Sequence, residues 1–157
     1  MKLEKLLIIV ASIVLLVIIA FFVLGHRSQS GKAYGLVEGR LQRCPGTPNC
    51  VSSEFVSDAQ HYVEPLAYSA DQAAQVLPRL KTIIRDMGGN IEVEQADYLA
   101  ATFTSSVFRF VDDLELRIDT EQSTIHLRSA SRVGRGDLGA NRKRVERLKH
   151  SFHSQTD

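Results

Sequence analysis

The chain has 157 residues, which is room for one domain of ordinary size. Its 19 Lys and Arg residues are nearly balanced by 18 Asp and Glu residues, which argues against a dedicated nucleic-acid-binding protein. Once a strongly apolar N-terminus is set aside, about 120 residues remain, enough to bury a core without a metal ion or several disulfides. We therefore expect no nucleic acid among its partners.

An apolar run extends from Leu6 to Leu24 and contains no charged residue and one hydroxyl group, that of Ser12. At about 1.5 Å per helical residue it spans roughly 28 Å, which matches the hydrocarbon core of a bilayer. A cleaved signal peptide has a shorter apolar region and a small-residue cleavage site, whereas this run ends in Ala-Phe-Phe-Val-Leu-Gly. The sequence predicts an uncleaved single-pass anchor over residues 1–25, with the lipid bilayer as partner.

The charges that flank this run do not predict the orientation of the helix in the membrane, because basic residues lie at both ends. They are Lys2 and Lys5 before the run, and Arg27, Lys32, Arg40 and Arg43 after it. A polar stretch over residues 26–39 shows no sustained periodicity and is interpreted as a juxtamembrane linker. Residues 40–152 are then the soluble domain, and residues 153–157 a tail.

The only two cysteines, Cys44 and Cys50, enclose Pro-Gly-Thr-Pro-Asn. Two prolines and a glycine favour a stiff turn between them, so a disulfide is favoured over free thiols. A metal site is the weaker interpretation, because no second Cys or His pair is placed to complete four ligands. Disulfides persist in oxidising compartments. The expected location is therefore the inner (cytoplasmic) membrane, with the domain on the extracytoplasmic, periplasmic side.

The periodicity of the domain predicts one short strand, a helix, three further strands and a last helix. We expect a strand over 62–68, a helix over 69–87, strands over 91–104, 108–119 and 124–130, and a helix over 137–150. Ser69 and Gln72 form a capping-box pattern, and Pro78 should kink or restart the helix behind them. This order predicts an α+β fold, a small antiparallel sheet with two helices packed on one face.

The strands over 108–119 and 124–130 can be aligned by matching their apolar faces. On the first strand this face comprises Phe108, Phe110, Leu114, Leu116 and Ile118. The alignment sets Ile118 opposite Ile125, Leu116 opposite Leu127, Arg117 opposite His126 and Asp112 opposite Ser131. It also sets Glu115 opposite Arg128, which predicts a structural ion pair.

Two polar residues fall on apolar positions, Asp112 on its strand and Asn141 on the last helix. The inward stripe of that helix is Leu138, Asn141, Val145, Leu148 and Phe152, with Asp137 as its N-cap. A buried carboxylate needs a partner, and Ser131, Arg132 and Asn141 are the nearest candidates. These residues are either a polar clamp between helix and sheet or a ligand site.

Anion binding and catalysis are weaker possibilities. Arg132, Arg135, Arg142, Lys143 and Arg144 gather near the helix start, where a phosphate or lipid headgroup could bind, although Asp137 competes for the same amides. Asp112 and Asp113 point to opposite faces of a strand and cannot form a catalytic dyad. No Ser-His-acid order, Gly-rich phosphate loop or metal-binding His pair occurs, so we expect no cofactor and no metal.

Four segments together resemble a known family. They are Cys44-Pro-Gly-Thr-Pro-Asn-Cys-Val-Ser-Ser53, Phe108-Arg-Phe-Val-Asp-Asp-Leu-Glu115, Arg128-Ser-Ala-Ser-Arg-Val-Gly134 and Asp137-Leu-Gly-Ala-Asn-Arg-Lys-Arg-Val-Glu146. In this order they are similar to the domain of unknown function 1499 family, over roughly residues 40 to 149. The family resembles bacterial envelope-anchored and thylakoid-lumen proteins, which favours export. It implies no activity.

Three functions follow as hypotheses. The first is a membrane-tethered, non-enzymatic domain that binds a small anionic ligand or an envelope protein through Asp112, Ser131, Arg132, Asp137, Asn141 and Arg142. The second is a hydrolase of envelope or lipid material with Asp112 or Asp113 as acid/base, which requires one carboxylate exposed in a pocket. The third is a purely structural scaffold.

Overall fold

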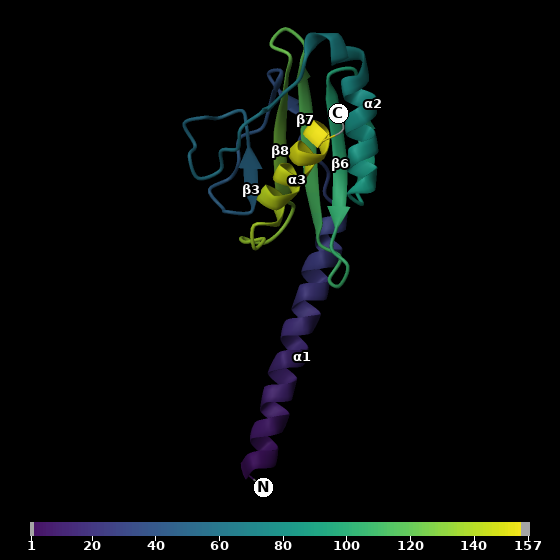
Figure 1. The fold of residues 1–157 in the computed structure, drawn as a ribbon. Coiled ribbons are helices and arrows are strands. Elements are labelled where there is room, and N and C mark those ends of the chain that lie inside the picture. The colour runs from purple at the N-terminus through teal and green to yellow at the C-terminus, as the bar shows by residue number, and fades with distance from the viewer. Residues whose placement is uncertain (1, 155–157) are drawn as a thin grey trace.

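The computed structural model describes residues 2–154 as a long N-terminal helix that projects from a mixed α and β domain (Figure 1). The helices are α1 (Lys2–Gln29), the short 3₁₀ helix η1 (Ala70–Gln72), α2 (Ala73–Asp86) and α3 (Ala140–Ser154). The strands are β1 (Leu36–Val37), β2 (Arg40–Leu41), β3 (Cys50–Ser52), β4 (Leu66–Ala67), β5 (Asn90–Glu94), β6 (Tyr98–Thr104), β7 (Val111–Asp119) and β8 (Thr124–Ser131). Residues 155–157 of the expected tail lie outside the described part of the chain.

The main sheet is antiparallel, with strand order β3-β8-β7-β6-β5 and with β4 also paired to β8. The register predicted for β7 and β8 is confirmed at all five of its positions. The pairs are Ile118 with Ile125, Leu116 with Leu127, Arg117 with His126, Glu115 with Arg128, and Asp112 with Ser131. The alternation of side chains was sufficient to set this register, because a slip of one residue would turn every apolar side chain to the wrong face.

Helices α2 and α3 pack together on one face of this sheet, which confirms the α+β fold class. The core between the layers is apolar and almost fully buried. It includes Leu80, Ile83 and Ile84 of α2, Val145, Leu148 and Phe152 of α3, and Leu99, Leu114, Leu116, Ile125 and Leu127 of the sheet. We call this the helix face, and its opposite the strap face.

The strap face is covered by the segment that follows α1, residues 30–44, which we call the strap. Residues 30–39 of the strap belong to the predicted linker. Strands β1 and β2 form a small antiparallel pair, and Leu41 packs with Tyr98 and Ala100 on the sheet. The disulfide between Cys44 and Cys50 is formed and packs with Ala130 on this same face. The linker prediction missed this strap because two-residue strands leave no periodic pattern.

Helix α1 is long and apolar enough to cross a membrane, and it continues through residues 26–29 of the expected linker. Its end is fixed to the domain. Ser28 is buried, and its hydroxyl donates to the Gly25 carbonyl at 2.6 Å and accepts from the Val111 amide at 3.0 Å. A Cβ atom at Gly25 would lie 1.7 Å from the Phe108 carbonyl oxygen, so only glycine fits this contact. The junction is therefore a packed joint.

Several local predictions were wrong. Ser69 makes no side-chain cap. Helix α2 does not restart at Pro78, which lies inside the helix, and the kink predicted there stays a prediction. Strand β7 begins at Val111, so Phe108 and Phe110 lie in the preceding loop, beside α1. Leu138 is 97% exposed with a φ of 54°, because α3 begins only at Ala140.

Candidate functional site

Strand β7 places Asp112 and Asp113 on opposite faces of the sheet, as its alternation predicts, and each carboxylate meets its own arginine. On the helix face, Arg144 donates to Asp112 at 2.8 Å. On the strap face, Arg132 donates to both oxygens of Asp113, at 2.9 and 2.7 Å. The prediction that Arg132 joins Asp112 was wrong, because Arg132 follows Ser131 and alternation turns it to the other face.

Asn141 ties α3 to the sheet and is only 1% exposed. Its amide oxygen accepts from Ser129 at 2.6 Å and from Arg144 at 2.5 Å. Its amide nitrogen donates to the Asn49 carbonyl, the Ser131 hydroxyl and the Asp137 carboxylate, at 3.1, 3.0 and 2.9 Å. Because its donor and acceptor groups are all engaged by protein, this cluster is a clamp between helix and sheet rather than an open site.

The predicted ion pair between Glu115 and Arg128 is present and completely buried on the strap face, at 2.7 Å. Glu115 also accepts from the Gly35 amide at 2.9 Å and from the Tyr98 hydroxyl at 2.8 Å. The ring of Tyr34 lies 5.0 Å from the Arg128 guanidinium carbon. Burial and the adjacent carboxylate of Glu115 raise the pKa of Tyr98, so its hydroxyl stays a donor. The strap therefore supplies partners for this pair.

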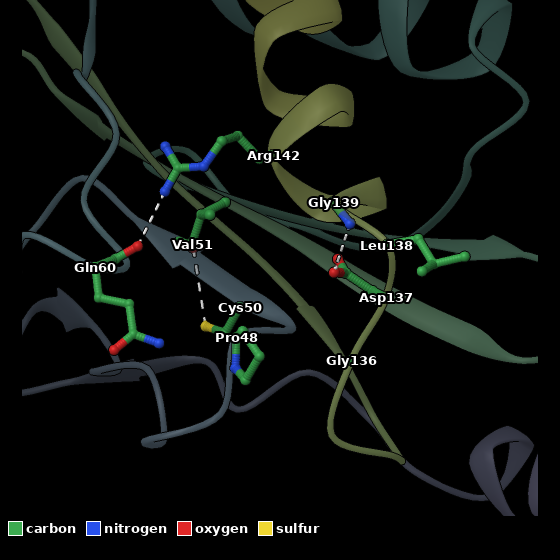
Figure 2. Close-up of a pocket in the computed structure, with 9 residues that line it drawn as sticks. All are labelled: Pro48, Cys50, Val51, Gln60, Gly136, Asp137, Leu138, Gly139 and Arg142. Carbon is green, nitrogen blue, oxygen red and sulfur yellow. Dashed lines mark hydrogen bonds between the residues drawn. The ribbon is translucent and has the colours of Figure 1, made fainter.

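Asp137 and Arg142 line a hollow of about 430 Å³ beside the disulfide (Figure 2). The Asp137 carboxylate accepts from the amides of Gly139 and Asn141, at 3.0 and 2.8 Å, and so occupies the donors at the start of α3. Arg142 donates to the carbonyls of Tyr62 and Gln60, at 3.0 and 3.1 Å. Leu138 points away from this group. The anion site predicted here is thus already filled by side chains of the protein.

The other basic residues predicted for that anion site do not gather at one place. Arg132 and Arg144 are paired with carboxylates on opposite faces, and Lys143 donates to the Leu138 carbonyl at 3.4 Å. Arg135 is exposed and lines a different hollow.

That second hollow lies at the base of the domain, where α1 enters. It has a volume of about 580 Å³ and lies between α1, the β6–β7 loop and residues 133–140. The apolar part of its lining, which we call its apolar wall, includes Phe21, Leu24, Phe108 and Phe110. The polar part, which we call its polar wall, includes Asp112, Ser131, Arg135 and Asp137. Three of the predicted site residues therefore do line a hollow, but together with aromatic residues of α1 and the loop that the sequence did not suggest. We call it the base hollow.

A third cluster, around Glu54, was missed by the sequence analysis. Glu54 accepts from Arg40 at 3.0 Å, from Arg117 at 2.8 Å and from the Leu41 amide at 3.3 Å, and it lies 4.0 Å from His126. Burial opposes the charge of Glu54, but the bonds from Arg117 and Arg40 outweigh it and lower its pKa. Burial lowers the pKa of His126.

A signal for this cluster was available in the register. Arg117 and His126 were predicted to lie opposite one another, and two basic groups at such positions repel unless an acid lies between them. Glu54 could not be identified as that acid, because nothing in its local pattern places residues 50–54 beside β8.

The contacts of Asp112 and Asp113 limit the access of a substrate to their carboxylates. Both oxygens of Asp113 are occupied by Arg132, and the side chain of Asp113 is only 7% exposed. Asp112 lines the base hollow but is paired with Arg144. A general acid or base must reach a substrate proton, and these arginines compete for the same oxygen atoms.

Comparison with known proteins identifies the family. No curated protein matches the chain. A family model described as "Protein of unknown function (DUF1499)" matches residues 40–152, from the second strand of the strap to the buried Phe152 near the end of α3. The match includes the strap disulfide, the Asn141 clamp and both walls of the base hollow except the residues of α1. This chain belongs to the DUF1499 family.

Proposed function

We propose that this protein is a membrane-anchored, non-enzymatic binding domain of the cell envelope, and that its ligand is an amphipathic molecule held in the base hollow. The single observation that carries the proposal is the composition of that hollow. Aromatic and aliphatic side chains of α1 and the β6–β7 loop form one wall, and Asp112, Ser131 and Arg135 lie in the other. A lipid offers this same division, with an apolar chain and a polar headgroup.

The anchor and its location are part of this proposal. The length and composition of α1 support a membrane span, and the disulfide between Cys44 and Cys50 supports an oxidising compartment such as the periplasm. The bilayer is then the first partner of the protein, through Leu6 to Leu24. An envelope protein as a further partner, and the exclusion of nucleic acid, remain predictions from the sequence.

The headgroup is expected to be anionic. Arg135 is exposed in the polar wall, and the carboxylates of Asp112 and Asp137 are offset by Arg144 and by the amides of α3. We therefore expect the positive charge of Arg135 to act on a headgroup more strongly than the negative charges of Asp112 and Asp137. This modifies the binding hypothesis from the sequence, because the side chains of Arg132 and Asn141 are engaged by other residues of the domain, whereas Arg135 lines the hollow.

A thermal-shift experiment tests this proposal. The full chain in phosphatidylcholine nanodiscs is titrated with monomeric dihexanoyl-phosphatidylglycerol, and in parallel with dihexanoyl-phosphatidylcholine. At ten times its Kd a ligand stabilises the folded state by about 1.4 kcal/mol, which raises the Tm of such a domain by several degrees. We expect this rise with the anionic lipid and a smaller one with the zwitterionic lipid.

Two matched variants separate the hollow from the surrounding bilayer. Ala140→Trp places a large side chain in the base hollow and should abolish the rise in Tm, whereas Ala59→Trp lies at another exposed alanine and should preserve it. No rise in the wild type, or an equal rise in both variants, would contradict binding in the hollow.

The hydrolase alternative has one supporting observation, the position of Asp112 at the edge of the hollow. It predicts that Asp112→Asn abolishes hydrolysis of an ester lipid by the full chain and leaves binding intact. The binding proposal predicts no hydrolysis by either protein.

A further inference from the structure

The β6–β7 loop, residues 105–110, packs against a part of α1 that belongs to the apolar run. The Phe108 ring lies 5.1 Å from the ring of Phe21 and 5.2 Å from that of Phe22, between centroids. Phe110 lies 6.1 Å from Phe21 in an edge-to-face arrangement. Figure 1 shows this loop hanging from the domain beside α1. The loop therefore reaches past the point where α1 joins the sheet.

The depth of these contacts follows from helix geometry. Phe21 precedes Leu24, the last residue of the apolar run, by three positions, which is about 4.5 Å along the helix axis. A side chain that touches Phe21 and Phe22 therefore lies on the bilayer side of Leu24. If α1 spans the membrane with this run, Phe108 cannot remain in bulk water.

The loop cannot swing away from this position without breaking buried contacts. The Phe108 carbonyl lies directly against Gly25, and the Val111 amide donates to the Ser28 hydroxyl. One contact lies within the loop and the other directly after it, and both join it to the same turn of α1. The loop and the end of α1 thus move as one body.

The surface around this joint has the composition of a membrane interface. Val107 is 64% exposed at the loop and Leu138 is 97% exposed, and both line the base hollow together with Phe108. Apolar residues that gather in this way mark an interaction surface more than single exposed ones do. Residues 105–110 contain no acid, and Arg109 stands between the two phenylalanines with an exposed side chain. Aromatic residues with a neighbouring arginine suit the headgroup layer, where the ring is buried and the guanidinium reaches phosphate.

We propose that the β6–β7 loop and Leu138 are seated in the interfacial layer of the leaflet from which α1 emerges, on anionic headgroups. The domain is then held on the membrane surface in one orientation, and the base hollow opens toward lipid. This inference rests on the membrane anchor proposed above and is independent of whether the hollow binds a ligand.

The absence of tryptophan from the chain makes a depth measurement possible with single-Trp variants. Val107→Trp probes the loop, and Val56→Trp is the matched control, because Val56 is an equally exposed valine (70%) outside the base. Leu15→Trp probes the middle of the apolar run. Each full-length variant is reconstituted into phosphatidylcholine and phosphatidylglycerol vesicles that carry lipids brominated either near the headgroup or at mid-chain. Bromines occupy both leaflets, so the orientation of insertion does not affect the result.

We expect the fluorescence of Trp at position 107 to be blue-shifted and to be quenched most by the shallow bromines. The fluorescence of Trp at position 15 should be quenched most by the deep bromines. That of Trp at position 56 should be unaffected. If position 15 is quenched while position 107 behaves like position 56, the loop is not in the bilayer and the inference is overturned with the anchor intact. A blue shift at position 107 without quenching would mean that protein covers the loop, which also overturns it. If position 15 is not quenched, the anchor itself fails and this inference fails with it.

Discussion

The two faces of the central sheet are built by the same strands but are closed by different means. The helix face is apolar along most of its length, and its polar groups are confined to one end, around Asn141. The strap face carries charged residues along β7 and β8, among them Glu115 and Arg128 in full burial. The apolar face needs only a complementary surface, whereas the charged face needs a partner for each group.

This difference explains why the strap belongs to the fold. Gly35 donates its amide to Glu115, Tyr34 stacks over Arg128, and Ser28 offers its carbonyl to Arg132 at 3.2 Å. The end of α1 and the strap thus supply partners to charged residues of the sheet. The position of α1 and the stability of the strap face are linked through these contacts.

The largest expected effect comes from breaking the buried pair. Arg128→Met leaves the Glu115 charge buried without its cation, and removal of one partner of such a pair costs about 3–5 kcal/mol. Urea unfolding of the full chain in detergent micelles, followed by the near-ultraviolet circular dichroism of the tyrosines, measures this loss. A loss of this size approaches the whole stability of a small domain, so Glu115→Gln is combined with Arg128→Met in a second variant. The double variant should recover stability relative to Arg128→Met, and no recovery would show that the pair is not coupled.

The clamp on the helix face should be the next most sensitive position. Asn141→Ala leaves several buried donors and acceptors without partners, at about 1–3 kcal/mol for each unsatisfied group, and we expect a total loss of about 2–4 kcal/mol. Lys143→Ala, two residues along the same helix on an exposed side chain, is the control and should change stability by less than about 0.5 kcal/mol. Equal effects of the two variants in urea unfolding would contradict the role of Asn141 as a clamp between helix and sheet.

A direct comparison of the faces is available on neighbouring residues of β7. Asp113→Asn removes the charge from a two-bond contact with Arg132 on the strap face, while Asp112→Asn weakens a single bond with Arg144 at the more open end of the helix face. Charge-assisted hydrogen bonds contribute about 1.5–3 kcal/mol. We expect Asp113→Asn to cost about 2 kcal/mol and Asp112→Asn about half of this. A reversed order in the same unfolding measurement would contradict the structural ranking of the faces.

The sequence was most informative where periodicity and pairing act together. The alternation of apolar side chains along the strands predicts the register of β7 and β8, and with it the pair of Glu115 and Arg128. The apolar stripe of the last helix predicts the burial of Asn141. The same logic failed for Phe108 and Phe110, because alternating aromatic residues fit a strand face as well as a loop beside an apolar helix. It also missed Arg144 as the partner of Asp112. Helix α3 is about four turns long and carries three arginines, and the sequence does not set which of them lies over the end of the strand.

The strap and the base hollow could not be predicted for a related reason. Their contacts join residues far apart in the chain, such as Ser28 with Val111 and Gly35 with Glu115. Short strands and single glycines carry no periodic signal, and their partners are set by the packing of the whole domain. The candidate site is made of such contacts. The sequence therefore predicted three of the residues that line the base hollow, Asp112, Ser131 and Asp137, but not the aromatic residues beside them.

The smallest expected effect concerns the pH dependence of the strap face. Both groups of the Glu54 cluster have a lowered pKa in the folded state, Glu54 from 4.5 and His126 from 6.5. On acidification the unfolded chain therefore binds more protons than the folded chain does. The free energy of unfolding decreases as the pH is lowered. The contribution of His126 is present above pH 6.5 and is lost as the pH falls from there through its folded pKa. That of Glu54 is lost below about 4.5.

His126→Gln should flatten the first part of this decline, and leave the second part, when the Tm of the full chain in nanodiscs is followed from neutral to acidic pH. His150→Gln, on the exposed surface of α3, should leave the whole profile unchanged. Among the residues that the structure describes, the core cluster of the helix face contains no carboxylate and no imidazole. Asn141→Ala should therefore lower the Tm at every pH and preserve the shape of the profile. If His126→Gln and Asn141→Ala gave profiles of the same shape, the acid sensitivity would not originate on the strap face, and the contrast between the two faces would be one of packing alone.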